Sequence, residues 1–200
     1  KIDFYYRAIT RFLRELGVFS LVLAGHSFGS AIAMNFAAAN PDQVKGLVLL
    51  STAERYCIPP EIFHVVADSD TYPIGVSMFR KWFFSPRTPV NRCDETISIL
   101  KNQRSTVLYS DFLTAARMDI KKNQPMISCP TWIACGKQDL ITPPSTCREF
   151  MKQFQNASFT AISAAGHMLP QEQPEKVATG LRDFLSTVNY SQKDIIEKSE

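Results

Sequence analysis

The sequence predicts an α/β fold in which a mostly parallel sheet is flanked by helices and interrupted by a helical insertion. Two short apolar runs early in the chain have the composition of strands buried on both faces, and a helical pattern separates them. Two further strand patterns follow residue 130, and each is again followed by a helix. Because strands that alternate with helices form parallel sheets through right-handed crossovers, these observations together define the fold class.

The first part of the chain, residues 1–52, is expected to supply two helices and two strands to this core. Apolar side chains recur at helical spacing near the start, and Gly17 stands where a left-handed helix end favours a residue without a Cβ. The two apolar runs are continuous rather than alternating, which is typical of strands covered on both faces. The predicted elements are a helix over 2–16, a strand over 20–24, a helix over 28–39 and a strand over 46–50.

The alternation of strands and helices stops over residues 53–128, which we expect to form a helical cap insertion. This stretch carries no buried-strand pattern and many aromatic residues. Residues 129–189 are expected to complete the core, and residues 190–200 to form a polar tail. The predicted elements after the cap are a strand over 131–135, a helix over 144–154, a strand over 158–163 and a helix over 174–188.

The composition excludes several classes of protein. The chain has 200 residues, of which 45% are hydrophobic and 20% charged, as in an ordinary globular domain. A net charge of +3 without runs of like charge argues against a nucleic-acid binder, and no apolar stretch is long enough for a membrane span. The five scattered cysteines contain no C-x-x-C pair, so we predict no metal site and a reduced, cytoplasmic protein. The oligomeric state stays open.

The sharpest chemical signal is a Gly-x-Ser-x-Gly motif at residues 25–29, between a predicted buried strand and a predicted helix. A tight turn in that context lifts Ser27 off the carboxyl edge of the sheet, where open α/β folds bind ligands. We expect Gly25 and Gly29 to be required, because a Cβ at either position would crowd the backbone. The N–H of Phe28, in the first helical turn, is expected to face a developing oxyanion. An ordinary turn is the alternative, and the flanking strand and helix argue against it.

A serine nucleophile needs a base within hydrogen-bonding reach, and the chain has three histidines. His167 follows the last predicted strand, on a loop that leaves the sheet at the same edge as Ser27, and it is the predicted base. His26 adjoins the nucleophile and is expected to pack in support of the turn. His64 lies in the cap insertion, where contact with solvent or packing is expected.

An orienting acid is expected between Ser27 and His167 in chain order, at the end of a strand. Asp139 meets this condition, since it follows the strand predicted over 131–135. Its carboxylate would accept the imidazole Nδ1–H and hold the tautomer. An Asx turn or a helix cap is the alternative role for Asp139. The rival acids Asp111 and Asp119 lie in the cap insertion without a preceding strand.

These three sites resemble the signature sites of the α/β-hydrolase superfamily. The match is closest to its single-domain esterases, lactonases and carbon–carbon bond hydrolases, and it covers nearly the whole chain except residues 53–128, which correspond to the variable cap of the family. The resemblance implies a cofactor-free serine hydrolase that uses a Ser-His-Asp triad on an ester-like bond of a small-molecule substrate. A serine at position 27 argues against the dehalogenase and epoxide hydrolase branches, which use a carboxylate there.

The sequence departs from that family at its start. Members normally begin with about four strands that precede the first helix seen here, and one of their loops completes the oxyanion hole. We therefore expect the second oxyanion donor to be absent from this chain. The favoured interpretation is a piece of a longer protein with an N-terminal segment before it, and the alternative is a shortened relative with impaired or altered chemistry. Two alternatives stay open, namely a non-catalytic binding module with a hydrolase-like fold and a carbon–carbon bond hydrolase with the same triad.

A substrate pocket is the last expectation. Trp82 and Phe83 in the cap insertion, together with Met168 beside the predicted base, are candidates for lining it. The alternative is that the cap aromatics form the small core that joins the cap to the sheet. Neither reading selects a substrate.

Overall fold

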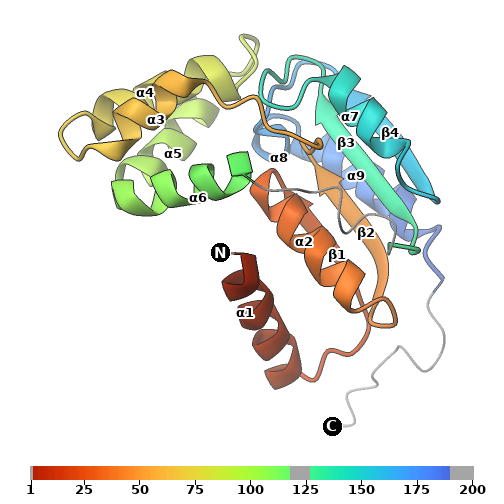
Figure 1. Ribbon diagram of the computed structural model, residues 1–200. Coiled ribbons are helices and arrows are strands. Elements are labelled where there is room, and N and C mark those ends of the chain that lie inside the picture. Colours follow the sequence, from red (N-terminus) through yellow and green to blue (C-terminus); the bar gives the residue numbers. More distant parts are fainter. Residues whose placement is uncertain (1, 118–126, 190–200) are drawn as a thin grey trace, which may run out of the picture.

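A parallel sheet with helices on both faces forms the larger part of the molecule, as expected (Figure 1). The computed structural model describes residues 2–117 and 127–189. In chain order its elements are α1 (Ile2–Glu15), β1 (Leu21–His26), α2 (Phe28–Ala39), β2 (Val44–Leu50), α3 (Pro60–Ala67), α4 (Tyr72–Phe83), α5 (Val90–Lys101), α6 (Ser105–Arg117), β3 (Thr131–Gly136), α7 (Pro144–Met151), β4 (Ala157–Ile162), α8 (Leu169–Glu172) and α9 (Pro174–Leu185).

The strands are ordered β1-β2-β3-β4, and every neighbouring pair is parallel. Leu49, in the middle of this register, pairs with Gly25 on one side and with Ile133 on the other. Because all strands run the same way, their carboxyl ends meet at one edge of the sheet. The loops that follow β1, β3 and β4 therefore leave the sheet beside one another.

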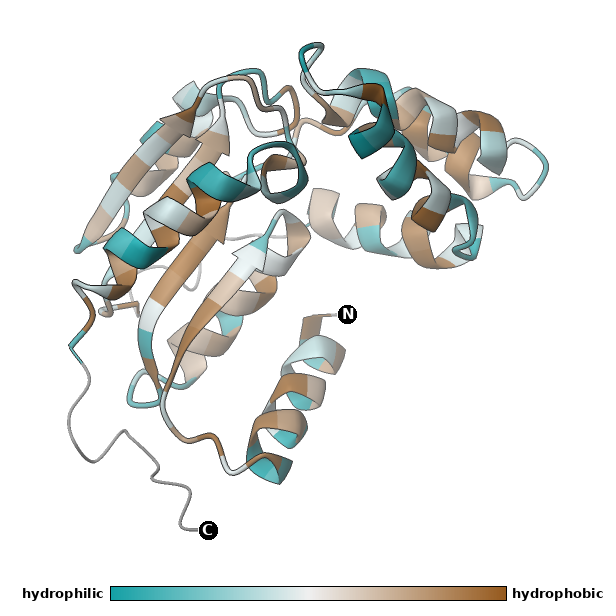
Figure 2. Cartoon of the chain, turned by 180° about the vertical axis from the view of Figure 1, so that it is seen from behind, coloured by the Kyte–Doolittle hydropathy of each residue, from teal (hydrophilic) through white to brown (hydrophobic). Residues whose placement is uncertain are grey.

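Both faces of the central strands are covered by apolar side chains. Leu47 and Leu49 of β2 belong to one core, which they share with α2 and α7, whereas Val48 and Leu50 belong to a second core with α9. Successive side chains of a strand point to opposite faces, so a continuous apolar run places apolar groups on both sides. Figure 2 shows this apolar colouring along the strands.

Helices α3 to α6 lie together beyond one end of the sheet, between β2 and β3 in the chain (Figure 1). They fall within the predicted cap insertion, and we keep the name cap for them. Residues 118–126 of that insertion and the predicted tail over 190–200 lie outside the described residues. The boundaries of the predicted core and cap segments stay predictions.

The observed elements differ from the predicted ones mainly at their ends. The prediction ended the first strand at residue 24, but β1 continues through Gly25 to His26 before the turn. The second strand begins earlier than predicted, at Val44. Helix α8 was not predicted, because four residues are too few to show a helical periodicity.

Two further observations concern the whole described chain. Within residues 2–117 and 127–189, no helix combines the length and the apolar character needed to cross a membrane. All five cysteines are free.

Candidate active site

Ser27 is the one residue between β1 and α2, and its backbone is strained. It has φ 53° and ψ −124°, in a region that residues with a Cβ rarely adopt. A Cβ on Gly25 would lie 2.4 Å from the carbonyl oxygen of Gly29, so only glycine fits there. The expectation for Gly29 is wrong, since among the described residues a Cβ there would meet no atom within 4 Å beyond its chain neighbours and the backbone of its own helix. Only Gly25 is therefore required by a close backbone contact, which β1 makes with the first turn of α2.

The strained turn is held by hydrogen bonds. The Tyr56 hydroxyl donates to the carbonyl oxygen of Ser27 at 2.8 Å, and the N–H of Ser30 donates to the same oxygen at 2.8 Å. The N–H of Ser27 donates to the carbonyl oxygen of Leu50 at 2.8 Å. These bonds fix the main chain on both sides of the Ser27 side chain.

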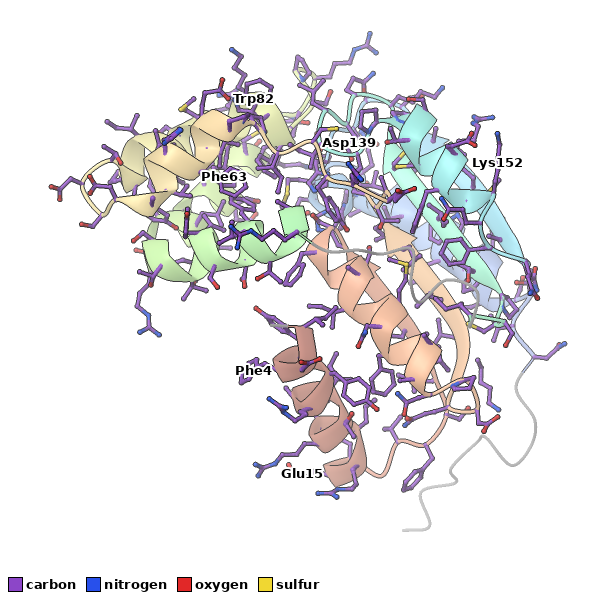
Figure 3. All side chains as sticks on the ribbon, viewed as in Figure 1. Phe4, Glu15, Phe63, Trp82, Asp139 and Lys152 are labelled. Atoms are coloured by element: carbon purple, nitrogen blue, oxygen red, sulfur yellow. The ribbon has the colours of Figure 1, made fainter. Side chains whose placement is uncertain are left out.

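The side chain of Ser27 lies beside that of His167. The distance from Ser27 Oγ to His167 Nε2 is 2.7 Å, and His167 Nδ1 lies 3.0 Å from Oδ2 and 3.1 Å from Oδ1 of Asp139. Figure 3 shows Asp139 at the end of the sheet that faces the cap. A carboxylate only accepts hydrogen bonds, so Nδ1 of His167 carries a proton. In the neutral ring Nε2 is then free to accept the Ser27 hydroxyl proton.

Asp139 and His167 are buried, with 3% and 1% of their surface exposed. The carboxylate of Asp139 also accepts the backbone N–H groups of Ile141 and Thr142 and the Thr142 hydroxyl, at 2.7 to 2.9 Å. Burial alone raises the pKa of Asp139, but the charge and hydrogen bond of His167 and the bonds from Thr142 outweigh it and hold the pKa below its usual value. The turn that was the alternative role for Asp139 is present, and the same carboxylate also contacts the imidazole of His167.

The side chains of the three candidate pocket residues differ in their contacts. The ring of Phe83 is buried and packs edge-on against His167, with 5.4 Å between ring centroids. Met168 follows His167 and is partly buried. Trp82 lies on α4 in the cap, with the ammonium of Lys81 5.5 Å from its ring centroid (Figure 3). Phe83 therefore contacts the candidate base, and the pocket itself stays a prediction.

Of the other candidates of the sequence analysis, the histidine and the aspartate of the cap have other surroundings, whereas Phe28 directly follows Ser27. His64 is exposed on α3. Asp111 accepts a hydrogen bond from the Tyr5 hydroxyl at 2.6 Å, and Asp119 lies outside the described residues. Phe28 is the first residue of α2, and its ring packs edge-on against Tyr5, with 5.4 Å between centroids.

Sequence reasoning missed several residues that hold this group in place. The contact with the N–H of Ile141 could have been found, because an aspartate carboxylate in a turn often accepts the backbone N–H two residues on. Tyr56 gave no such signal, since its contact with Ser27 crosses from the start of the cap to the turn after β1. Its position depends on tertiary packing.

His26 packs beneath His167, as expected. Its Nε2 lies 2.7 Å from the carbonyl oxygen of His167, so Nε2 carries the proton and donates it. Burial and, to a smaller extent, the charge of His167 lower the pKa of His26 to about 4. His26 is therefore a neutral donor that ties the loop of His167 to the strand that precedes Ser27.

This low pKa predicts a loss of stability in weak acid. An unfolded chain protonates His26 near its ordinary pKa of 6.5, whereas the folded chain protonates it only near pH 4. The unfolded state therefore holds more protons between these values, and the free energy of unfolding falls as the pH decreases through that window, by on the order of 3 kcal/mol. His26→Gln keeps an N–H donor without a titratable group, so urea unfolding at pH 7 and at pH 4.5 should show a smaller loss than in the unmodified chain. His64→Gln, at an exposed position, is the matched control, and an equal loss in His26→Gln would contradict the assignment.

The chain matches a family model described as serine aminopeptidase, S33, over residues 4–174. It is similar to a monoacylglycerol lipase of Mus musculus, with 31% identity over 151 residues, which cover 76% of this chain and 37% of that protein. Among solved structures it is similar to an esterase from Exiguobacterium antarcticum, with a TM-score of 0.81, 18% identity, and coverage of 91% of this chain and 72% of that one. A thermophilic esterase from Thermogutta terrifontis gives a TM-score of 0.77 and 24% identity, over 90% of this chain and 70% of that one. At these identities the two structures show a shared fold.

Proposed function

Because the chain belongs to the serine aminopeptidase S33 family and has an α/β-hydrolase fold, we propose that it is a serine hydrolase of ester-like acyl bonds. In this proposal Ser27 is the nucleophile, His167 the general base and Asp139 the acid that orients the imidazole. The observation that carries it is the continuous chain of hydrogen bonds from Ser27 Oγ through both ring nitrogens of His167 to the Asp139 carboxylate. The substrate class is a small carboxylic ester, lactone or thioester.

The proposed reaction has two halves. His167 Nε2 takes the Ser27 hydroxyl proton as Oγ bonds to the acyl carbon, and the carbonyl electron pair moves onto oxygen. The tetrahedral intermediate then collapses, the bond to the leaving group breaks, and the leaving group takes the proton from His167. Water next attacks the acyl group on Ser27, again with His167 as base, and releases a carboxylic acid and the free serine.

Three features of the site support this chemistry. The lowered pKa of Asp139 keeps its carboxylate ionised at neutral pH, where it stabilises the imidazolium that forms in each half-reaction. Ser27 Oγ makes no hydrogen bond that caps α2 and instead lies 2.7 Å from His167 Nε2. Phe28 begins α2, and its N–H at the positive end of the helix dipole is the proposed oxyanion donor.

A fluorophosphonate probe tests the proposal, because it reacts with a serine only when a base has activated the hydroxyl. We expect labelling of the native chain, with the mass increase located by peptide mapping on the peptide that carries Ser27. Heat-denatured protein is the control and should stay unlabelled, since the hydrogen-bonded chain is then lost. Labelling on another residue, or none in the native chain, would contradict the proposal. Turnover of a panel of esters, lactones and thioesters would then define the acyl bond.

A further inference from the structure

Glu172, the last residue of α8, is a buried carboxylate that the proposed reaction does not use. Only 3% of its surface is exposed. Its Oε2 accepts the N–H of Ser85 at 2.7 Å and the hydroxyl of Thr88, and its Oε1 accepts the N–H of Gly166 at 2.8 Å. Burying a carboxylate costs several kcal/mol unless hydrogen bonds replace its water. Three buried donors around the Glu172 carboxylate therefore indicate that the protein compensates for its lost hydration.

The donors come from two separate segments. Ser85 and Thr88 belong to the stretch that joins α4 to α5 in the cap, whereas Gly166 precedes His167 in the loop between β4 and α8. Glu172 therefore joins the cap to the segment that carries the candidate base. Arg92 of α5 adds a second link from the cap, since it donates to the carbonyl oxygen of Glu172 at 3.0 Å.

The two segments touch through their backbones at this place. A Cβ on Gly166 would lie 2.6 Å from the nitrogen of Ser85 and 2.9 Å from the carbonyl oxygen of Phe83, so no side chain fits between them. That carbonyl of Phe83 accepts the N–H of His167 at 2.8 Å and the N–H of Met168 at 3.1 Å. The backbone N–H groups of His167 and Met168 are thus both hydrogen-bonded to the last residue of α4.

We propose that Glu172 is a positioning residue for His167, and that its carboxylate clamps Gly166 to the 85–88 segment so that the Phe83 carbonyl is held beneath the His167 and Met168 N–H groups. The carboxylate of Glu172 holds the backbone of Gly166, and the carbonyl of Phe83 holds the backbone of His167. The reach of His167 Nε2 to Ser27 Oγ then depends on the cap through Glu172. This role rests on the proposed function, in which His167 is the base.

Glu172→Gln gives the sharpest variant, because it keeps the shape of the side chain and removes one acceptor. Whichever way the amide is turned, its NH2 group faces at least one backbone N–H, of Ser85 or of Gly166, and that donor loses its partner. Thr88→Val is a milder variant that removes only the hydroxyl donor to Oε2 and leaves both backbone donors. Glu175→Gln is the matched control, since Glu175 is exposed at the start of α9.

The experiment has a kinetic and a spectroscopic arm. For a p-nitrophenyl ester we expect Glu172→Gln to lower kcat at least tenfold with KM changed less than about twofold, because a displaced base slows chemistry more than binding. Thr88→Val should lower kcat by about three- to fivefold, and Glu175→Gln should stay within about twofold. In proton NMR, the far-downfield signal of the proton between His167 Nδ1 and Asp139 should shift or broaden in Glu172→Gln and stay unchanged in Glu175→Gln.

The outcomes separate positioning from mere stabilisation and from failure of the proposed function. A lower melting temperature in Glu172→Gln with unchanged kcat and an unchanged His167 signal would overturn the proposal. If the unmodified chain shows no turnover, the proposed function fails, whereas the NMR arm still tests whether Glu172 positions His167. If Glu172→Gln does not fold, a wild-type kcat and His167 signal in Thr88→Val would overturn the proposal, and a reduced kcat with a shifted signal would support it.

Discussion

Replacing Ser27 by alanine is expected to lower kcat for an activated ester by about a millionfold relative to the unmodified chain. The substitution removes the hydroxyl whose Oγ lies 2.7 Å from His167 Nε2, so the proposed base has no nucleophile to activate. The residual rate of the variant comes from substrate positioning and from the oxyanion donor. His167 can add to it only by activating water directly. Steady-state turnover of a p-nitrophenyl ester measures the loss, after fluorophosphonate titration has given the concentration of active sites in the unmodified protein.

The variant should fold normally, which makes the kinetic result interpretable. The turn at residue 27 is held by backbone contacts, including those with Tyr56 and Leu50, and none of them uses the serine hydroxyl. Alanine adopts the same positive φ at a cost similar to that of serine. We therefore expect a melting temperature close to that of the unmodified chain. Ser145→Ala, at an exposed position on α7, is the control. If kcat of Ser27→Ala were within tenfold of kcat of Ser145→Ala, Ser27 would be excluded as the nucleophile.

From the sequence, Ser27, Asp139 and His167 are expected at one edge of the sheet, because parallel topology alone brings these positions together. The turn at Ser27 was predicted from a local motif between a strand and a helix, and both elements are present at that place. Asp139 and His167 were predicted from their positions after strands, and parallel strands bring such positions to one edge. Neither prediction required knowledge of side-chain packing.

Packing decided what the sequence did not predict. Glycine at position 29 looked equivalent to Gly25 in the motif, yet only Gly25 faces another backbone at close range, since it lies on β1 under the first turn of α2. The carboxylate of Glu172 meets donors 84 and 87 residues earlier in the chain, and no periodicity in the sequence indicates such a contact. The arrangement of the cap helices likewise depends on aromatic packing, as in the stacked rings of Phe79, Phe83 and Phe112. Contacts of this kind are set by three-dimensional shape rather than by pattern.

Asp139→Asn is expected to lower kcat by about ten-thousandfold while changing the shape of the site very little. The two carboxylate oxygens of Asp139 accept three hydrogen bonds from Ile141 and Thr142 and also contact His167 Nδ1. An amide whose oxygen takes the Oδ1 position still accepts the N–H groups of Ile141 and Thr142, and its NH2 group then takes the Oδ2 position, which lies 3.0 Å from His167 Nδ1. The neutral imidazole then carries its proton on Nε2, where it faces Ser27 Oγ as a donor and cannot take the hydroxyl proton.

The same substitution should also change how the reaction and the fold respond to acid. The folded pKa of Asp139 is depressed, so its carboxylate stabilises the fold above the unfolded pKa near 3.8, and that contribution disappears as the pH falls through the lower folded value. Asp139→Asn should lack this acid-side loss in urea unfolding, while its kcat stays low at every pH because the wrong tautomer is held by the turn. Thr142→Val, which removes one donor to the carboxylate but keeps the acceptor for His167, is the matched variant and should retain most of the activity. An Asp139→Asn protein as active as Thr142→Val would assign the orienting role to another group and leave Asp139 as the residue that closes the turn after β3.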